Sequence, residues 1–356
     1  MSELERYGWN ESREAAFAAF RARGWVPGRV SLEHKRMYRI RTEDGELLAE
    51  PSGKLRYEAT GRDDLPAVGD WVAATARPDE GKATIHAVLP RTSKFSRRAA
   101  GSEPIEQIVA ANVDTVFLVS SLNRDFNPRR LERYLLLAWE SGANPVIVLT
   151  KADACPDPSP YVEQAEAIGL GVPVHAVSAE TGEGMEAVRH YVSLGRTAAL
   201  LGSSGVGKST LANALAGESR LAVAGIREQD ARGRHTTTHR ELFPLPSGGV
   251  LIDTPGMREI QLWDAGAGLT ETFEDVVAAA RGCRFADCRH EREPGCAVRE
   301  ALRDGTLSEG RYRNYRKMEA EAAYAARKES AKSQAAMKQH AKALNKQMRE
   351  QTKHRR

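Results

Sequence analysis

The sequence predicts an all-β barrel, followed by an α/β domain and then by an α-helical, metal-binding domain. Short alternating segments separated by turns fill residues 30–96, and strands and helices alternate over residues 105–268. Three cysteines lie close together between positions 283 and 296. With 356 residues, the chain has the length of two or three domains of about 150 residues each.

The composition is that of a protein that can bury hydrophobic cores. Hydrophobic residues make up 41% of the chain and charged residues 28%, values typical of globular domains. No run approaches the ~18 apolar residues of a membrane span, and residues 1–9 lack the apolar stretch of a secretory signal. These observations predict a cytoplasmic protein with no membrane partner.

Residues 1–34 are expected to form an N-terminal extension. Glu11–Arg23 has a helix-forming composition, with Phe17 and Phe20 three residues apart, and Gly24 can end such a helix. The segment is either a docking helix or a flexible extension, and no chemistry is assigned to it.

Residues 35–100 are expected to form a small barrel. The expected strands are Arg36–Arg41, Leu47–Pro51, Lys54–Thr60, Asp70–Ala76 and Ala83–Leu89. Five short strands separated by glycine-containing turns favour an OB-fold. Such barrels often bind nucleic acid, and a structural barrel with a solvated basic edge is an equal alternative. The basic cluster at the barrel's exit consists of Arg91, Lys94, Arg97 and Arg98.

Residues 101–268 are expected to form a doubly wound α/β domain. Residues 113–120 read as a strand buried on both faces, and Pro128–Ser141 has the apolar spacing of a helix. The expected elements that follow are Pro145–Leu149, Val162–Ile168, Pro173–Val177, Glu183–Val192, Thr197–Leu201 and Val250–Ile252. Repeated strand–helix units favour a mostly parallel sheet, whose ligands bind at the carboxyl ends of the strands.

One of these strand ends carries a phosphate-binding loop, between Thr197–Leu201 and a helical pattern. Its glycines allow backbone amides to converge on phosphate oxygens at a helix N-terminus. Lys208 reaches the outer phosphates, and the Ser209 hydroxyl is placed to bind Mg²⁺. The candidate nucleotide ligands in this loop are Gly202, Ser203, Ser204, Gly205, Val206, Gly207, Lys208, Ser209 and Thr210.

Two other strand ends predict a preference for guanine. Thr150-Lys151-Ala152-Asp153 resembles the Asn-Lys-x-Asp element of GTPases, with threonine in place of asparagine. The Asp153 carboxylate can accept hydrogen bonds from guanine N1–H and from the guanine amino group, a donor pair that adenine lacks. Ser178 and Ala179, after the next strand, resemble the second base-contacting element of the same class.

Two segments after the phosphate loop resemble the switches of GTPases. Asp253-Thr254-Pro255-Gly256 resembles the element in which an aspartate holds Mg²⁺ through water and a glycine amide senses the γ-phosphate. Residues 233–239 contain three threonines, one of which can close over Mg²⁺. The base-reading pair therefore precedes the phosphate loop, and the phosphate loop precedes the switches. In an ordinary small GTPase the phosphate loop comes first and the base-reading element lies near the end, so the order here is circularly permuted.

Met257 lies where Ras-type proteins have the glutamine that orients the attacking water. A thioether cannot orient water, so slow intrinsic hydrolysis is expected. His235 is the candidate for positioning the water, and the alternative is a histidine that packs within the switch loop.

Three cysteines and one histidine within 14 residues predict a metal site. Cys283, Cys288, His290 and Cys296 supply all four ligands of a tetrahedral site. A complete set favours structural Zn²⁺ over a catalytic site, which keeps one position open. The alternative is free cysteines in a helical region. Arginines alternate with these ligands, at Arg281, Arg284, Arg289 and Arg292, so the module would also present a basic surface.

Residues 308–356 read as helix. An apolar stripe in the first part is expected to dock on the zinc module, and consists of Tyr312, Tyr315, Met318, Ala322 and Ala325. Residues 327–356 carry ten lysines and arginines against two glutamates, so this tail holds a charge of +8 while residues 1–326 sum to −4. Such a tail favours a polyanionic partner, and a solvated charged face is the alternative.

Taken together, these motifs resemble those of the circularly permuted, small-ribosomal-subunit-dependent GTPases called RsgA (also YjeQ), over about residues 35–320. The shared features are the barrel, the permuted order, the phosphate loop, His235-Thr236-Thr237-Thr238, residues 253–259 and the Cys/His cluster. The resemblance implies a switch threonine at Thr237, which serves catalysis and Mg²⁺, and a hydrolysis-relevant histidine at His235. It further implies a factor in late maturation of the small (30S) subunit that binds 16S rRNA and is stimulated by that subunit.

We therefore predict a multidomain protein that hydrolyses GTP. The expected parts are an N-terminal extension (1–34), an OB-fold barrel (35–100), a circularly permuted P-loop GTPase domain (101–268), an α-helical zinc-binding domain (269–326) and a basic tail (327–356). Ser209, Thr237 and Asp253 are expected to hold Mg²⁺ with GTP, one structural Zn²⁺ is expected, and the protein is expected to be a monomer.

Two other functions are weighed against this one. An RNA-binding scaffold with a vestigial nucleotide site is disfavoured by the intact Lys208, Ser209 and Asp253. An ATP-driven RNA chaperone is disfavoured by Asp153, because that carboxylate recognises guanine.

Overall fold

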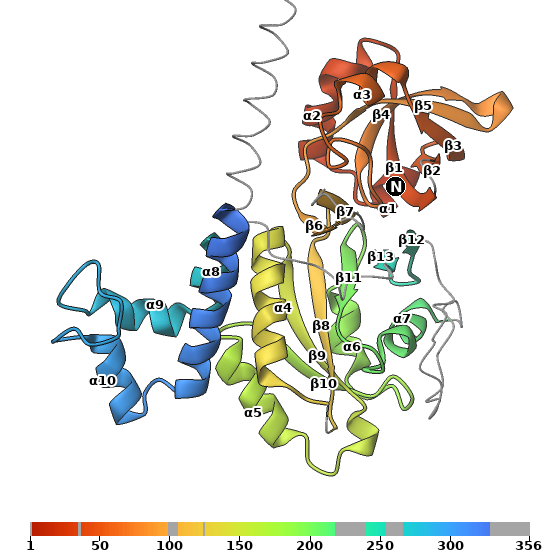
Figure 1. Ribbon diagram of the computed structural model, residues 1–356. Coiled ribbons are helices and arrows are strands. Elements are labelled where there is room, and N and C mark those ends of the chain that lie inside the picture. The colour runs from red at the N-terminus through yellow and green to blue at the C-terminus, as the bar shows by residue number, and fades with distance from the viewer. Residues whose placement is uncertain are drawn as a thin grey trace, which may run out of the picture. The chain divides into compact units, whose positions relative to one another are not determined.

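The computed structural model describes residues 2–34, 37–98, 106–123, 125–217, 240–253 and 266–327. The chain divides into two compact units, Met1–Gln261 and Leu262–Arg356, and each is described by itself. Among the described residues of the first unit, eleven strands form one sheet in the order β10-β9-β8-β11-β13-β12-β1-β2-β3-β5-β4 (Figure 1). No described helix is both long and apolar enough to cross a membrane.

One end of this sheet closes into the expected five-stranded barrel. Its strands are β1 (Val26–His34), β2 (Met37–Thr42), β3 (Gly45–Pro51), β4 (Trp71–Arg77) and β5 (Lys82–Val88). The ring closes because β1 pairs with both β2 and β4, while β5 joins β3 to β4. The core is formed by Val30, Tyr38, Ile40, Leu47, Ala49, Val72, Ala74, Ala83 and Ile85, all of them buried.

Strand β1 lies within the residues that were expected to be an extension, and it connects the barrel to the rest of the sheet. Residues 26–29 pair with β4, whereas Leu32 and Glu33 pair with β12 (Arg240–Pro244). A register shift between Val30 and Leu32 interrupts the ladder to β2, and such a bulge bends a strand. One strand can therefore belong to the barrel and also pair with the α/β part of the sheet.

The expected strand Lys54–Thr60 is wrong, because this segment begins with a short helix, α3 (Gly53–Glu58). The Ser52 side chain accepts a hydrogen bond of 3.1 Å from the Leu55 N–H and caps the helix. Leu55, Tyr57 and Ala59 alternate as in a strand, but Tyr57 is 90% exposed and no residue of α3 is buried. The N-cap serine favours a helix here, and this helix still packs the partly buried Leu55 against the barrel core.

The other end of the sheet is the expected doubly wound α/β domain. Strands β8 (Thr115–Ser121), β9 (Asn144–Thr150), β10 (Val174–Val177), β11 (Thr197–Leu201) and β13 (Val250–Asp253) are parallel, and β12 is antiparallel to β13. Helices α4 (Pro128–Ser141) and α5 (Ser159–Ile168) cover one face, and α6 (Met185–His190) and α7 (Lys208–Ala216) cover the other (Figure 1). The predicted helix 128–141 and strand 197–201 are confirmed at both ends.

Local sequence explains the best-defined elements. All seven residues of β8 are buried, as a strand covered by helices on both faces requires. The Asn127 side chain accepts hydrogen bonds from the backbone N–H groups of Arg129 (3.0 Å) and Arg130 (3.3 Å), so it caps α4. Gly142 ends α4 in the left-handed region, with φ of 83°.

The N-terminal segment docks rather than extending freely. It forms α1 (Glu3–Arg6) and α2 (Glu11–Arg21), and Phe17 of α2 is fully buried. The Trp9 ring lies against Trp71 of the barrel, with centroids 4.9 Å apart. Edge contacts of this kind between buried aromatic rings add about 0.5–1.5 kcal/mol beyond the area that they bury. The docking alternative is therefore the one that the structure supports.

A short two-stranded ladder, β6 (Lys94–Arg98) and β7 (Glu106–Ala111), lies between the barrel and the α/β domain in the chain. Lys94 pairs with Glu106 at 3.1 Å across this ladder. Two single-turn 3₁₀ helices, η1 (Pro78–Glu80) and η2 (Ala152–Ala154), complete the described elements of the first unit.

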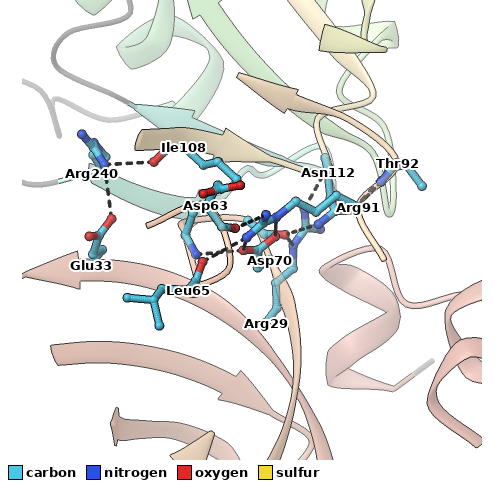
Figure 2. Close-up of polar contacts among 12 residues, drawn as sticks. Arg29, Glu33, Asp63, Leu65, Asp70, Arg91, Thr92, Ile108, Asn112 and Arg240 are labelled. Carbon is cyan, nitrogen blue, oxygen red and sulfur yellow. Dashed lines mark hydrogen bonds and ion pairs between the residues drawn. The ribbon is translucent and has the colours of Figure 1, made fainter. Parts of the chain in front are cut away.

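A buried polar network fixes the barrel to the α/β domain (Figure 2). Asp70 is fully buried and accepts two hydrogen bonds of 2.7 Å from the Arg91 guanidinium. The remaining Arg91 donors reach the backbone carbonyls of Asp63 (2.6 Å) and Leu65 (3.0 Å). All the named Arg91 contacts are made within the protein, so Arg91 fits neither of the two alternatives for the basic cluster, a nucleic-acid-binding surface or a solvated edge.

Arg29, on β1, is the second buried cation of this network. It donates to the backbone carbonyls of Gly69 (3.3 Å), Asn112 (3.1 Å) and Tyr7, and it lies 5.1 Å from the centroid of the Trp71 ring. Burial lowers the pKa of Arg29 to about 9. Three carbonyls from three different segments thus replace the water that the guanidinium loses on folding.

The second unit contains α8 (Gly266–Thr272), α9 (Glu274–Arg281), α10 (Ala297–Asp304) and a helix over 309–327. The predicted stripe on the last helix makes the expected contacts. The Tyr315 ring lies 5.5 Å from the Phe273 ring, the Tyr312 ring lies 6.4 Å from the His290 ring, and Met318 is buried. Residues 328–356, which include most of the basic tail, lie outside the described residues.

Candidate nucleotide site and metal centre

The strand register brings the predicted nucleotide motifs to one edge of the sheet. Thr150 ends β9 and lies opposite Val177 of β10 on one side and Ser121 of β8 on the other. Leu201 ends β11 and pairs with Leu118 of β8. Since all four strands are parallel, the loops that follow β9, β10 and β11 emerge at the same edge.

The phosphate loop has the backbone that its glycines predict. Gly207 lies in the left-handed region, with φ of 91°, and is the residue before α7. Gly202 has a different constraint, because a Cβ there would lie 2.4 Å from the Val119 carbonyl oxygen of the neighbouring strand. Ser209 and Thr210 follow Lys208 in the first turn of α7, where free N–H groups favour an anion.

Lys208 folds back over its own loop. Its ammonium donates to the backbone carbonyls of Gly202 (2.8 Å) and Ser203 (2.5 Å). The tip of the lysine therefore lies at the first residues of the loop, which marks that end as the place for the β- and γ-phosphates that such a lysine binds.

The Thr150-Lys151 pair contacts the phosphate loop directly. The Thr150 hydroxyl donates to the Val206 carbonyl at 2.5 Å, and a second carbonyl, that of Ser120, lies at 3.2 Å. The Lys151 ammonium donates to the Gly205 carbonyl at 2.9 Å. The two side chains hold the base-reading segment against the loop, so threonine supplies a tie here in the place of asparagine.

The remaining residues of the base-reading pair lie at the same strand ends. Asp153 is exposed, within η2, and Ala179 is half-buried. Ser178 is fully buried, and its hydroxyl accepts a hydrogen bond of 3.1 Å from the Thr181 N–H. Ser178 therefore fixes the shape of its own loop.

Asp253 is the last residue of β13. This strand pairs with β11, the strand that leads into the phosphate loop. Burial raises the pKa of the Asp253 carboxyl, and the nearby Lys208 ammonium opposes this rise. A half-buried carboxylate beside a phosphate loop is stabilised by a nearby cation. Three other predicted site residues, His235, Thr237 and Gly256, lie outside the described residues, as does Met257.

The structure adds one residue that the sequence did not indicate. Arg130, in the first turn of α4, donates a hydrogen bond of 2.6 Å from Nη1 to the Ser203 hydroxyl of the phosphate loop. The only local signal is that the first turn of α4 carries two arginines and no acidic residue. The contact spans 73 positions of the chain, and no short motif reports on it.

The four predicted metal ligands converge in the second unit. Their ligand atoms all lie within 4.8 Å of one another. The Cys283 and Cys296 sulfurs are 3.9 Å apart, and His290 Nδ1 lies 3.5 Å and 3.4 Å from them. A tetrahedral Zn²⁺ with Zn–S of about 2.3 Å requires sulfurs about 3.8 Å apart. The cluster therefore has the dimensions of a closed zinc site, and Cys288 completes it.

The surroundings of Cys283 and His290 favour the forms that bind a metal ion, whereas burial raises the pKa of the Cys288 thiol to about 11. Although burial acts to raise it, the pKa of the Cys283 thiol is lowered by the backbone N–H groups of Val298 and Ala297. Burial lowers the pKa of His290, which keeps its imidazole neutral. A thiolate and a neutral imidazole are the states that bind a metal ion.

Glu293 organises the loop between His290 and Cys296. Its carboxylate accepts hydrogen bonds from the backbone N–H groups of Arg289 (3.0 Å), Glu291 (2.9 Å) and Arg292 (2.9 Å). Its own backbone N–H and these three lower the pKa of the Glu293 carboxyl to about 2. The loop is therefore shaped by an anion at its centre.

Comparison with known proteins identifies the family. Residues 88–263 match the family model described as RsgA GTPase. The chain is 48% identical over 334 residues to the small ribosomal subunit biogenesis GTPase RsgA of Opitutus terrae, with 91% of each chain covered. The chain belongs to the RsgA GTPase family. It is also 44% identical over 352 residues to the RsgA protein of Syntrophotalea carbinolica, with 97% of this chain and 96% of that one covered.

Solved structures agree with this assignment. The crystal structure of YjeQ from Thermotoga maritima superposes with a TM-score of 0.62 at 30% identity, over 84% of this chain and 99% of that one. YloQ, described as a circularly permuted GTPase, has a TM-score of 0.59 at 24% identity and so shows the fold alone. The permuted order expected from the motifs is confirmed by the order of the strands that carry them.

Proposed function

We propose that this chain hydrolyses GTP as a biogenesis factor in late maturation of the small (30S) ribosomal subunit, and that the subunit stimulates hydrolysis. The observation that carries the proposal is the contact between the base-reading segment and the phosphate loop, made by Thr150 and Lys151. This contact supports one continuous site for a nucleotide's base and its phosphates. The names of the relatives in Opitutus terrae and Syntrophotalea carbinolica supply the ribosomal context.

In this proposal, the loop of residues 202–210 holds the phosphates and Asp153 selects guanine, with Lys151, Ala152, Ser178 and Ala179 around the base. The Thr150 contact supports a site that is already assembled before nucleotide binds. Gly256 would sense the γ-phosphate.

Magnesium would be held by Ser209, Thr237 and Asp253, and it would neutralise charge on the β- and γ-phosphates. The half-buried Asp253 carboxyl fits this role because its local electrostatics favour a nearby cation. Lys208 and Thr237 would act in catalysis. His235 would position the attacking water, since the methionine at position 257 cannot.

We further propose that residues 269–326 form a helical domain around one structural Zn²⁺ bound by Cys283, Cys288, His290 and Cys296. The other proposed parts are the extension at 1–34, of which 26–34 is a barrel strand, the barrel from 35 to 100, the GTPase domain at 101–268 and the tail at 327–356. A complete set of four ligands leaves no open position, so the metal would stabilise the fold.

The proposed partners are the small subunit with its 16S rRNA, GTP and GDP. The charge of +8 on residues 327–356 favours contact with phosphates, and such binding should weaken steeply as salt rises. The protein would act in the cytoplasm as a monomer.

The test is hydrolysis of GTP and of ATP by the purified protein, each with and without isolated small subunits. We expect slow GTP hydrolysis that rises strongly with subunits, and no comparable ATP hydrolysis. Binding to subunits without any nucleotide hydrolysis would favour the scaffold with a vestigial site. Equal hydrolysis of ATP would favour the ATP-driven chaperone.

A further inference from the structure

Arg130 occupies an unusual electrostatic position. It lies in the first turn of α4, where the helix dipole disfavours a cation by about 0.3–1 kcal/mol. Arg129 precedes it and no acidic residue offsets the pair in this turn. Among the described residues, the Arg130 guanidinium has no carboxylate partner, and its hydrogen bond goes to the neutral Ser203 hydroxyl at 2.6 Å.

The contact lies at one particular end of the phosphate loop. The Ser203 carbonyl, on the same residue, accepts from the Lys208 ammonium at 2.5 Å. Thr150 and Lys151 bind the loop further along, at Val206 and Gly205. Thr150 and Lys151 therefore bind the end of the loop that is nearer to the base-reading segment. Arg130 binds the other end, where the Lys208 ammonium lies.

A half-buried arginine at a helix N-terminus, with no carboxylate partner among the described residues, would be stabilised by a nearby anion. The first residues of the loop are where the lysine tip, and hence the β- and γ-phosphates, belong. A triphosphate carries more negative charge at that end than a diphosphate. The cation at position 130 should therefore favour the triphosphate.

We propose that Arg130 is a positioning residue that acts through Ser203 to hold the γ-phosphate end of the loop, and that it raises the preference for GTP over GDP. The inference rests on the proposed function, because it assumes that the loop binds guanine nucleotides. It adds a determinant of nucleotide state that lies on α4, outside the sequence motifs of the site.

The test measures dissociation constants of fluorescent GTP and GDP analogues for the full-length protein and for Arg130→Gln. We expect the ratio of GTP to GDP affinity to fall by roughly ten-fold, the effect of losing a charge-assisted hydrogen bond. Arg129→Gln is the matched control, since it removes the same charge from the same turn at an exposed position. The ratio should be unchanged in this control.

Two further variants test the route through Ser203. Ser203→Ala should reproduce the loss, and combining it with Arg130→Gln should add little, because both remove one contact. Arg130→Lys, which keeps the charge without the planar fork, should fall between wild type and Arg130→Gln.

Equal ratios in Arg130→Gln and Arg129→Gln would overturn the proposal, as would a wild-type ratio in Ser203→Ala. Failure of the wild-type protein to bind either analogue would instead overturn the proposed function. The two failures are therefore distinguishable, and thermal melting of each variant identifies any that does not fold.

Discussion

Replacing Thr150 with valine removes one hydroxyl and keeps the shape of the side chain. In the structure this hydroxyl donates to the Val206 carbonyl at 2.5 Å, and Thr150 is only 3% exposed. An unmade hydrogen bond to a buried carbonyl costs about 1–3 kcal/mol. This loss can appear in two quantities. It weakens GTP binding to the extent that the phosphate loop is no longer held in place, and the remainder lowers the free energy of unfolding.

Titration with a fluorescent GTP analogue and unfolding in urea measure the two parts. Thr150→Val should weaken GTP binding by up to roughly 150-fold, and the two losses together should amount to about 1–3 kcal/mol. Thr150→Ser keeps the donor and should stay close to wild type.

Thr197→Val is the matched control. Thr197 is fully buried in β11, a parallel strand of the same sheet, and its hydroxyl has no hydrogen-bond partner among the described residues. Removing that hydroxyl should be neutral or stabilising, since no bond is lost. If Thr150→Val and Thr197→Val behave alike in both assays, the tie between the base-reading segment and the phosphate loop contributes nothing.

Three further predictions concern the buried polar network around Asp70 and the metal centre. Asp70→Asn should lower the free energy of unfolding by about 3–5 kcal/mol, because it removes the charge from the buried side of the Asp70–Arg91 ion pair. Loss of the exposed Lys54–Glu58 pair in Glu58→Gln should cost under about 1 kcal/mol. Denaturant unfolding compares the two, and equal values would contradict the role of the network. Cys288→Ser should lose bound zinc and helical circular dichroism, whereas Cys155→Ser, outside the cluster, should keep both; full zinc content without Cys288 would contradict the assigned ligand set. Glu293→Gln should speed the loss of zinc to a chelator, and Glu291→Gln should not. Because the Glu293 pKa is lowered from 4.5 to about 2, its ordering effect should be complete above pH 4.5 and disappear only as the pH falls toward 2; equal rates for the two variants would refute it.

Local sequence was sufficient to predict those elements whose end signals and apolar pattern both favour the same structure. The helix 128–141 has a capping asparagine, a proline at its first position and a C-terminal glycine, and its bounds are as predicted. The phosphate loop and the metal ligands are also evident from sequence, because their chemistry requires fixed spacings over a few residues.

Local sequence did not predict the structure of segments that depend on contacts with residues far away in the chain. The segment 54–60 alternates like a strand, yet Ser52 caps it as a helix, which packs Leu55 against the barrel core and leaves Tyr57 exposed. Strand β1 was missed because Pro27 and Gly28 weaken its strand signal, and because two of its three partners, β4 and β12, lie far along the chain. Arg91 reads as a surface cation until the fold brings Asp70 to it.

The central claim is that one guanine nucleotide binds where the segment 150–153 meets the phosphate loop. Asp153→Asn tests it most directly, since the substitution replaces the carboxylate that accepts from the guanine amino group with an amide that can donate. Measuring the affinities of the variant for GTP and for xanthosine triphosphate should show a preference reversed toward xanthosine. An unchanged preference for GTP would place base recognition elsewhere and contradict the claim.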